Sequence, residues 1–206
     1  MIAIVDYGVG NLFSLQCSLD AIGASSVVTA DENVIKDADK LILPGVGAFA
    51  DAAQKLPTTG LDRAVVGFAA SGQPLLGICL GMQMLFEESI EYGRQKGLGL
   101  LSGHIAPISD VIPKGLKVPH IGWNALHFTR ETPLFSRIKE GDCVYFVHSY
   151  YARNCEDSLV AVTDYGVPLT AAVQKGNIYG CQFHPEKSGE VGLNILRSFC
   201  FGEAAK

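Results

Sequence analysis

The sequence predicts a single α/β domain over residues 1–206: a mostly parallel central sheet flanked by helices, with an added antiparallel portion. Short apolar runs in the first half are typical of strands buried on both faces of a parallel sheet, and helix-like segments separate them. After Gly97, short strand-like segments follow one another closely instead. The composition, 48% hydrophobic and 18% charged, is that of a compact chain rather than a disordered one.

Each element can be placed along the chain. Buried strands are expected at Ile2–Val5, Lys40–Leu43 and Leu75–Ile78. Helices are expected at about 11–22, 61–70, 80–88 and 190–201, the first because its leucines and isoleucine recur at helical spacing. Later strands are expected at Cys143–Val147, Leu159–Thr163, Thr170–Gln174 and Ile178–Phe183. Gly176-Asn177 between the last two predicts a hairpin turn.

Charge and cysteine usage exclude several classes of protein. The formal net charge is −5 and no basic cluster is present, so nucleic-acid binding through phosphates is not expected. None of the six cysteines forms a C-x-x-C pair, so neither a zinc site nor a dithiol redox site is indicated. The N-terminus does not resemble a signal peptide, and the scattered cysteines are interpreted as reduced thiols of a cytoplasmic protein.

Two features of the sequence suggest alternatives to this interpretation. The run Ala64–Phe86 is uncharged and long enough to span a bilayer, but a turn signal at 71–74 and the polar Gln83 favour a helix end, a buried strand and a second helix start. Gly8-Val9-Gly10 follows a strand as in a dinucleotide fingerprint, but Phe13 stands where the third glycine belongs. Neither a membrane span nor a nicotinamide or flavin site is therefore expected.

The informative segment is Gly77-Ile78-Cys79-Leu80-Gly81, where an apolar strand runs directly into a helix. Glycines two places before and after a nucleophile form the sharp strand-to-helix elbow that lifts its side chain above the sheet edge. The start of a helix favours a thiolate at Cys79, and the backbone N–H of Leu80 can point at a developing oxyanion. A buried structural cysteine is the alternative, but it does not explain both glycines.

A base is needed for this thiol, and His184 is the favoured one of five histidines. It ends an expected strand and is followed by Pro185-Glu186. In an extended chain, His184 and Glu186 point to the same side, so the carboxylate can accept from one imidazole nitrogen while the other faces Cys79. The three residues would form a Cys-His-Glu triad for acyl transfer.

The motifs G-I-C-L-G-M-Q and Q-F-H-P-E-K-S resemble those of the triad (class I) glutamine amidotransferases. That resemblance implies that Cys79 is the nucleophile, His184 the general base and then acid, and Glu186 the group that orients His184. No metal or organic cofactor is implied. The segments D-Y-G-V-G-N-L, L-P-G-V-G-A-F, P-H-I-G-W-N and Y-F-V-H-S-Y narrow the resemblance to glutaminase subunits of histidine biosynthesis, and it extends over essentially the whole chain.

The narrower resemblance implies further roles. An oxyanion strand at Pro44–Gly47 would supply a backbone N–H at Val46 or Gly47, after a peptide flip that glycine permits, beside that of Leu80. The residues expected to contact glutamine are Gly47, Gln83, Ser149 and Tyr150. The residues expected at the gate or partner interface are Asn11, Trp123, Tyr145, His148 and Lys187.

The activity implied by the resemblance is hydrolysis of glutamine to glutamate and ammonia. The ammonia would pass to a (β/α)₈ barrel cyclase subunit in a heterodimer, which makes imidazole glycerol phosphate and aminoimidazole carboxamide ribotide. Two alternatives remain open. One is the glutaminase of pyridoxal phosphate synthesis, against which the segments at 119–124 and 145–150 count. The other is a non-catalytic binding module, against which the intact triad counts.

Overall fold

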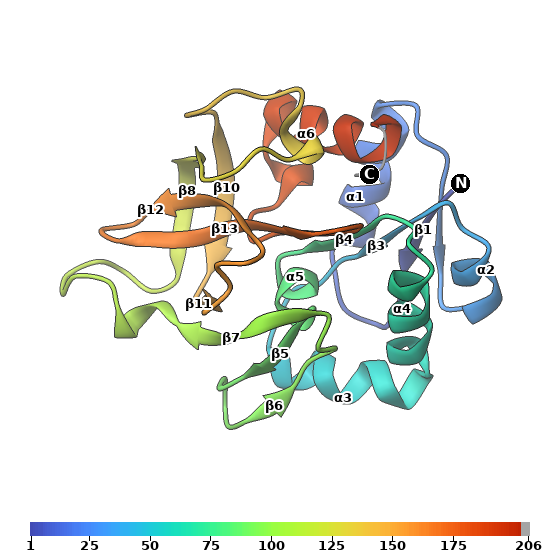
Figure 1. Ribbon diagram of the computed structural model, residues 1–206, viewed down its shortest axis with the longest axis horizontal. Coiled ribbons are helices and arrows are strands. Elements are labelled where there is room, and N and C mark those ends of the chain that lie inside the picture. Colours follow the sequence, from blue (N-terminus) through green and yellow to red (C-terminus); the bar gives the residue numbers. More distant parts are fainter. Residues whose placement is uncertain (203–206) are drawn as a thin grey trace.

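The computed structural model describes residues 1–202, and its main feature is a sheet of order β2-β1-β3-β4-β14-β13-β12-β9 (Figure 1). Its parallel strands are β2 (Ser26–Thr29), β1 (Ile2–Val5), β3 (Lys40–Leu43), β4 (Leu75–Ile78) and β14 (Ile178–Cys181). Antiparallel pairing extends it through β13 (Pro168–Lys175), β12 (Leu159–Asp164) and β9 (His127–Phe128). The predicted fold class is confirmed.

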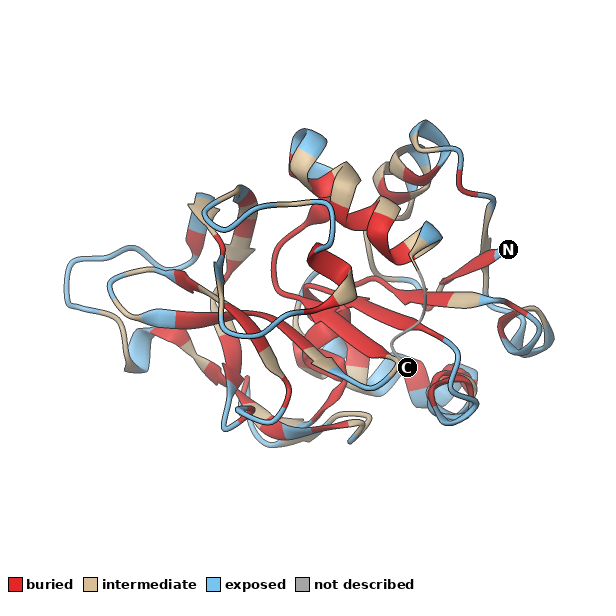
Figure 2. Cartoon of the chain, turned by 45° about the horizontal axis from the view of Figure 1, so that its top comes forward, coloured by how far each residue is buried: buried red, intermediate tan, exposed pale blue. Residues whose placement is uncertain are grey.

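Helices cover both faces of the parallel strands. One face carries α1 (Leu12–Ala21) and α6 (Gly189–Phe201), and the other carries α2 (Glu32–Lys36), α3 (Phe49–Thr59) and α4 (Leu61–Ala70). Alternation along β1 divides the core, because Ile4 packs in the cluster with Leu15 whereas Val5 packs in the cluster with Leu56. Strands β1, β3 and β4 are therefore buried on both faces, as their apolar runs predict (Figure 2).

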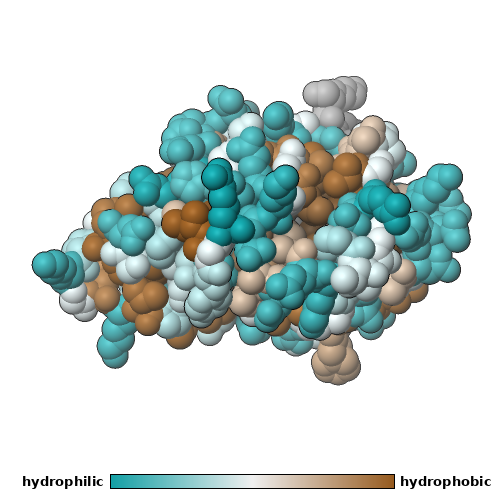
Figure 3. Space-filling view, turned by 90° about the horizontal axis from the view of Figure 1, so that it is seen from below, coloured by the Kyte–Doolittle hydropathy of each residue, from teal (hydrophilic) through white to brown (hydrophobic). Residues whose placement is uncertain are grey.

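Two smaller sheets extend the molecule beside the main one. The first has the order β11-β7-β5-β6. Its strands are β11 (Tyr150–Arg153), β7 (Leu101–Pro107), β5 (Phe86–Ser89) and β6 (Gln95–Lys96). The second pairs β10 (Cys143–His148) with β8 (His120–Ala125). On the face that includes α3, β6 and β7, hydrophobic side chains form small groups among hydrophilic ones (Figure 3).

Several predicted elements match the structure closely. The three expected buried strands are β1, β3 and β4 at the expected bounds, and α4 coincides with the expected helix. The hairpin at Gly176-Asn177 is confirmed, because Lys175 and Ile178 on either side pair directly between β13 and β14. Gly176 has a φ of 57°, as such a turn requires.

Other expectations are wrong in their bounds. The helix expected over 80–88 is α5 (Leu80–Met84), because Phe86 is fully buried in strand β5 and pairs with Leu101. The strand expected to reach Phe183 ends at Cys181. The uncharged run Ala64–Phe86 is divided mainly among α4, β4 and α5. Within residues 1–202, no helix has the length and apolarity needed to cross a membrane.

Candidate active site

The strand-to-helix elbow holds Cys79 in a strained backbone conformation, with φ 53° and ψ −111°. Non-glycine residues at positive φ are uncommon and cost about 1–3 kcal/mol, so surrounding contacts must hold them. The N–H of Cys79 donates to the Cys181 carbonyl (2.8 Å), and the N–H of Gln83 donates to the Cys79 carbonyl (3.0 Å). The strain at Cys79 is thus locked by β14 on one side and α5 on the other.

The two elbow glycines are required by close approach. A Cβ on Gly77 would lie 2.7 Å from the Cα of Met82, and a Cβ on Gly81 would lie 1.8 Å from the carbonyl oxygen of Leu43. Backbone atoms cannot yield as the tip of a side chain can. The spacing of glycines around Cys79 therefore follows from how tightly α5 packs on β3 and β4.

His184 and Glu186 are hydrogen-bonded, with 2.8 Å between Nδ1 and Oε1, and both side chains are buried. The contact arises differently from the sequence-based expectation. Pro185–Lys187 forms a 3₁₀ turn rather than an extended chain, and this turn brings the carboxylate back to the imidazole. The other carboxylate oxygen, Oε2, is buried and has no hydrogen-bond partner among the described residues.

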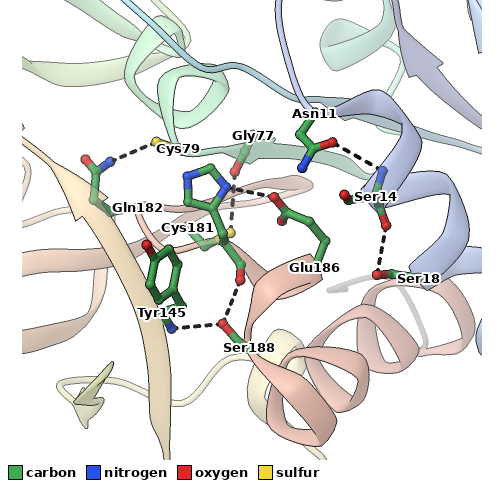
Figure 4. A network of polar contacts seen from close by, with 11 residues as sticks. Asn11, Ser14, Ser18, Gly77, Cys79, Tyr145, Cys181, Gln182, Glu186 and Ser188 are labelled. Carbon is green, nitrogen blue, oxygen red and sulfur yellow. Dashed lines mark hydrogen bonds and ion pairs between the residues drawn. The ribbon is translucent and has the colours of Figure 1, made fainter. Parts of the chain in front are cut away.

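Ser188 and Tyr145 fix the backbone of His184 (Figure 4). The Ser188 hydroxyl donates to the His184 carbonyl (2.6 Å) and accepts from the N–H of Tyr145 (3.0 Å). The N–H of His184 donates to the Tyr145 carbonyl (2.9 Å). The position of the imidazole is therefore set by strand β10 as well as by its own turn.

The charge state of His184 follows from its two side-chain partners. Burial lowers its pKa, but hydrogen bonds and charge interactions with Cys79 and Glu186 outweigh burial and raise the pKa to about 9. At neutral pH the imidazole is thus protonated. Its Nδ1 is bonded to Glu186, and its other ring nitrogen faces Cys79. This arrangement suits an imidazolium beside a thiolate.

A cavity of about 280 Å³ opens over Cys79 and His184. It brings together most residues expected at the site from the sequence: Cys79, His184, Val46, Gly47, Leu80, Gln83, His148, Ser149 and Tyr150. Glu186 lies behind His184, outside the lining. Within residues 1–202, no group of three or more His, Cys, Asp or Glu side chains is arranged to hold a metal ion.

The expected oxyanion strand lies against the elbow in a closed arrangement. The N–H of Leu80 donates to the Gly45 carbonyl (3.3 Å), so the donor expected to face the substrate is engaged within the protein. The start of this strand is anchored by the Tyr7 hydroxyl, which donates to the Pro44 carbonyl (2.8 Å). Val46, at the pocket wall, is 40% exposed.

Two side chains in this region were missed by sequence reasoning. Glu91 lines the cavity, and its Oε2 accepts from the N–H of Phe49 (2.6 Å). Burial raises the pKa of Glu91. Gln182 is fully buried, and its Nε2 donates to Cys79 Sγ (3.7 Å). Gln182 is the first residue of the Q-F-H-P-E-K-S motif, but its spacing from Cys79 does not indicate this contact. Glu91 lies outside all of the motifs.

His148 belongs to a buried pair at the cavity wall. Its Nδ1 lies 2.9 Å from the Tyr150 carbonyl, and its Nε2 lies 3.0 Å from Nδ1 of His120. A carbonyl oxygen only accepts, so Nδ1 of His148 carries the proton. Burial lowers the pKa of His148 to about 4. The neutral imidazole therefore holds the backbone of Tyr150 from behind.

The remaining expected gate and interface residues lie outside the cavity. Trp123 and Tyr145 face each other across β8 and β10 with ring centroids 5.8 Å apart, and Lys187 Nζ lies 5.9 Å from the Tyr145 ring. Trp123 is 56% exposed. Asn11 caps α1, its Oδ1 accepting from the N–H of Ser14 (3.3 Å). Trp123 of β8 and Lys187 of the 3₁₀ turn thus form an aromatic and cationic group around Tyr145 of β10.

Solved structures share this architecture at low sequence identity. A structure described as a glutamine amidotransferase matches with a TM-score of 0.75 at 19% identity, over 97% of each chain. The structure of PurLQS from Thermotoga maritima matches with a TM-score of 0.72 at 23% identity, over 96% of each chain. These matches establish the fold alone.

Sequence comparison establishes the family. The model of glutamine amidotransferase class-I matches residues 3–202. Imidazole glycerol phosphate synthase subunit HisH of Caldanaerobacter subterraneus is 49% identical, covering 100% of this chain and 99% of that protein. The HisH subunit of Bacillus licheniformis is 50% identical over 97% of this chain and 95% of that protein. The chain therefore belongs to the class I glutamine amidotransferases, among the HisH subunits of imidazole glycerol phosphate synthase.

Proposed function

We propose that this chain hydrolyses glutamine through Cys79, His184 and Glu186 and delivers the ammonia to a (β/α)₈ barrel cyclase subunit. One observation carries the proposal: an elbow cysteine and a histidine line the same cavity, and a buried carboxylate is hydrogen-bonded to that histidine. This is the arrangement that acyl transfer by a thiolate requires. The relatives are named as subunits of imidazole glycerol phosphate synthase, which supports this role, and we place the chain in histidine biosynthesis in the cytoplasm.

The reaction begins at the carboxamide carbon of glutamine. The Cys79 thiolate attacks this carbon, and the negative charge moves to the amide oxygen. The His184 imidazolium then gives its proton to the departing nitrogen, so ammonia leaves and a glutamyl thioester remains. Glu186 keeps Nδ1 engaged, so that the other ring nitrogen delivers this proton.

Water completes the cycle. His184, now neutral, takes a proton from a water molecule that attacks the thioester carbon. The C–S bond breaks, glutamate is released, and the imidazolium–thiolate pair is restored. Each turnover thus converts glutamine and water into glutamate and ammonia without a metal or organic cofactor.

Charges at the cavity wall support an amino acid as substrate. Glutamine carries an α-ammonium group, and the Glu91 carboxylate lines the cavity with Gln83, Ser149 and Tyr150. Gln83 uses its Nε2 within the protein, toward Tyr150 and Gln182, which leaves its Oε1 for the substrate. We assign the ammonium to Glu91 and the remaining polar contacts to these neighbours.

The engaged N–H of Leu80 supports gating by the partner. A tetrahedral oxyanion needs backbone donors at 2.7–3.1 Å, and this donor is bonded to Gly45. Binding of the liganded cyclase would favour a state in which the oxyanion strand releases Leu80 and turns the N–H of Val46 or Gly47 inward.

In the second half-reaction, the cyclase uses the ammonia on a ribosyl-phosphate substrate to form imidazole glycerol phosphate and aminoimidazole carboxamide ribotide.

The decisive experiment separates glutamine hydrolysis from ammonia use. In the reconstituted heterodimer, Cys79→Ala should abolish glutamine-dependent synthesis while added ammonium salt still supports it. Cys143→Ala, which changes an exposed cysteine, is the matched control and should leave both activities unchanged. Retention of glutamine-dependent synthesis by Cys79→Ala would refute the nucleophile. Loss of ammonium-dependent synthesis in an intact heterodimer would refute the division of labour.

A further inference from the structure

Gln182 makes two side-chain hydrogen bonds for which the reaction above has no use. Its Nε2 donates to Cys79 Sγ (3.7 Å), and its Oε1 accepts from Gln83 Nε2 (3.0 Å). The side chain is fully buried, so both ends of its amide are satisfied inside the protein. Figure 4 shows this amide pointing at the sulfur of Cys79.

The orientation of the Gln182 side-chain amide is set by Gln83 and the Tyr150 carbonyl. Gln83 Nε2 also approaches the Tyr150 carbonyl (3.2 Å), and a carbonyl oxygen can only accept. Gln83 must therefore place its NH₂ group between Tyr150 and Gln182. Gln182 must in turn present its oxygen to Gln83, which leaves its NH₂ group facing Cys79. The chain Tyr150–Gln83–Gln182 thus determines that Cys79 meets a donor.

The neighbouring thiol, that of Cys181, meets a hydrogen-bond acceptor instead of a donor. Cys181 Sγ donates to the Gly77 carbonyl (3.8 Å) and is fully buried (Figure 4). Burial above all, and then the charges at Glu186 and Cys79, raise the pKa of the Cys181 thiol. Cys181 therefore faces a backbone acceptor, which suits a thiol, whereas Cys79 faces an amide N–H donor, which suits a sulfur that carries negative charge.

We propose that Gln182 is a positioning residue that stabilises the Cys79 thiolate through its side-chain N–H, and that Gln83 sets the orientation of this donor. The proposal rests on the proposed role of Cys79 as nucleophile. The Cys79 thiolate would then be stabilised by two groups, the His184 imidazolium and the Gln182 N–H. Gln182 also links the nucleophile to the backbone of Tyr150, so that the cavity wall and the sulfur share one hydrogen-bonded chain.

The test measures thiolate reactivity without glutamine or a partner. The full chain is treated with iodoacetamide between pH 6 and 10, and alkylation of Cys79 is followed by peptide mass spectrometry. For Gln182→Leu, the rate at pH 6.5 should fall about tenfold, the size of effect that a hydrogen bond to a charged group supports. At pH 10, where the solution itself favours the thiolate, the N–H donor should matter less and the two rates should converge. A merely structural role would lower the rate at both pH values.

Two further variants sharpen the test. Gln83→Met removes the group that orients Gln182, so it should also slow alkylation at pH 6.5. Gln182→Glu keeps an acceptor for Gln83 but turns an oxygen toward Cys79, so it should also slow alkylation of Cys79. This variant supplies the test if Gln182→Leu does not fold. Gln174→Leu on β13 is the matched control, because its Nε2 bonds only the Gly176 carbonyl at the surface.

The outcomes distinguish this proposal from the proposed function. Unchanged rates at pH 6.5 in the folded Gln182 and Gln83 variants would overturn the role of Gln182, and leave Cys79 as nucleophile. Mapping of a reactive diazo-ketone analogue of glutamine to another cysteine would overturn the proposed function. The alkylation profile of Gln182→Leu would in that case still report on the N–H···S contact.

Discussion

The backbone N–H of Leu80 donates a hydrogen bond to the carbonyl oxygen of Gly45 across 3.3 Å. Leu80 directly follows the proposed nucleophile, and Gly45 belongs to the proposed oxyanion strand. The structure therefore shows the elbow and that segment bonded to each other, so the proposed oxyanion donor is engaged within the protein.

This contact predicts slow glutamine hydrolysis by the chain alone. Removal of one oxyanion-hole donor costs about 10²–10³ in rate, so the liganded barrel subunit should accelerate glutamate release by at least about a hundredfold. Glutamate release with and without the partner and its ligand measures this ratio. A rate for the isolated chain within a few-fold of that of the complex would contradict gating by Leu80 and Gly45.

A second prediction concerns Gly81, which packs on β3 without room for a side chain. A Cβ there would lie 1.8 Å from the Leu43 carbonyl oxygen, so Gly81→Ala should lower the free energy of unfolding by about 3 kcal/mol or more. The urea midpoint of the purified chain measures it. Gly67→Ala in α4 is the matched control, because a Cβ there meets nothing within 4 Å. That change should raise stability by roughly 0.5–1 kcal/mol. Equal effects of the two changes would refute the packing argument.

Much of the fold could be predicted because its signals are local. The buried strands β1, β3 and β4 are short apolar runs that no amphipathic helix would contain, and their bounds were found. Strands β5, β7 and β8 lack such a local signal, because pairing with separate segments holds them, as Phe86 pairs with Leu101. The helix expected over 80–88 extends too far for the same reason, because the pairing of Phe86 beside β7 and its burial have no local signature.

The site shows the same division. Cys79 with its glycines and His184 with Glu186 lie in short motifs whose spacing reflects local geometry, although the His184–Glu186 contact depends on a 3₁₀ turn that the sequence did not reveal. Contacts between distant segments were missed, such as Glu91 with Phe49 and Gln182 with Cys79. Which residue meets the sulfur depends on the register of β14 against β4, and spacing along the chain does not encode it.

A third prediction follows from the pKa of His184, raised to about 9 against an ordinary value of about 6.5. The folded state holds this proton more tightly, so its contribution to stability is fully present below pH 6.5 and is lost as the pH rises through 9. In Glu186→Gln, one cause of the raised pKa is removed. The loss of unfolding free energy between pH 6 and 9.5 should therefore be smaller in the variant by roughly 1–2 kcal/mol.

Urea unfolding of both proteins at the two pH values measures this difference. Comparison of the two proteins cancels the contributions of groups that the substitution leaves unchanged. The same pH dependence in wild type and Glu186→Gln would show that the carboxylate does not hold the proton on His184.

The last prediction concerns Trp123, the single tryptophan of the chain, which is 56% exposed. Its ring packs edge-on against Tyr145, and the Tyr145 carbonyl accepts from the N–H of His184. Trp123 lies on β8, and its neighbour Tyr145 lies on β10, the strand bonded to the proposed general base, so a partner that covers Trp123 acts one strand away from His184. Buried aromatic anchors carry much of the affinity of an interface, so Trp123→Ala should weaken binding of the barrel subunit about tenfold or more.

Isothermal titration calorimetry of the barrel subunit against each variant measures this effect. Phe201→Ala is the matched control. Phe201 is also a half-exposed aromatic residue, and it is the last residue of α6. The end of α6 lies beside Lys40, the first residue of β3. This is the amino-terminal end of the parallel strands, and the cavity is at their other end. Binding should be unchanged by Phe201→Ala, because the partner must reach the cavity to receive ammonia. If the two variants bound alike, Trp123 would lie outside the interface, and the proposed route from the partner through Tyr145 to His184 would be wrong.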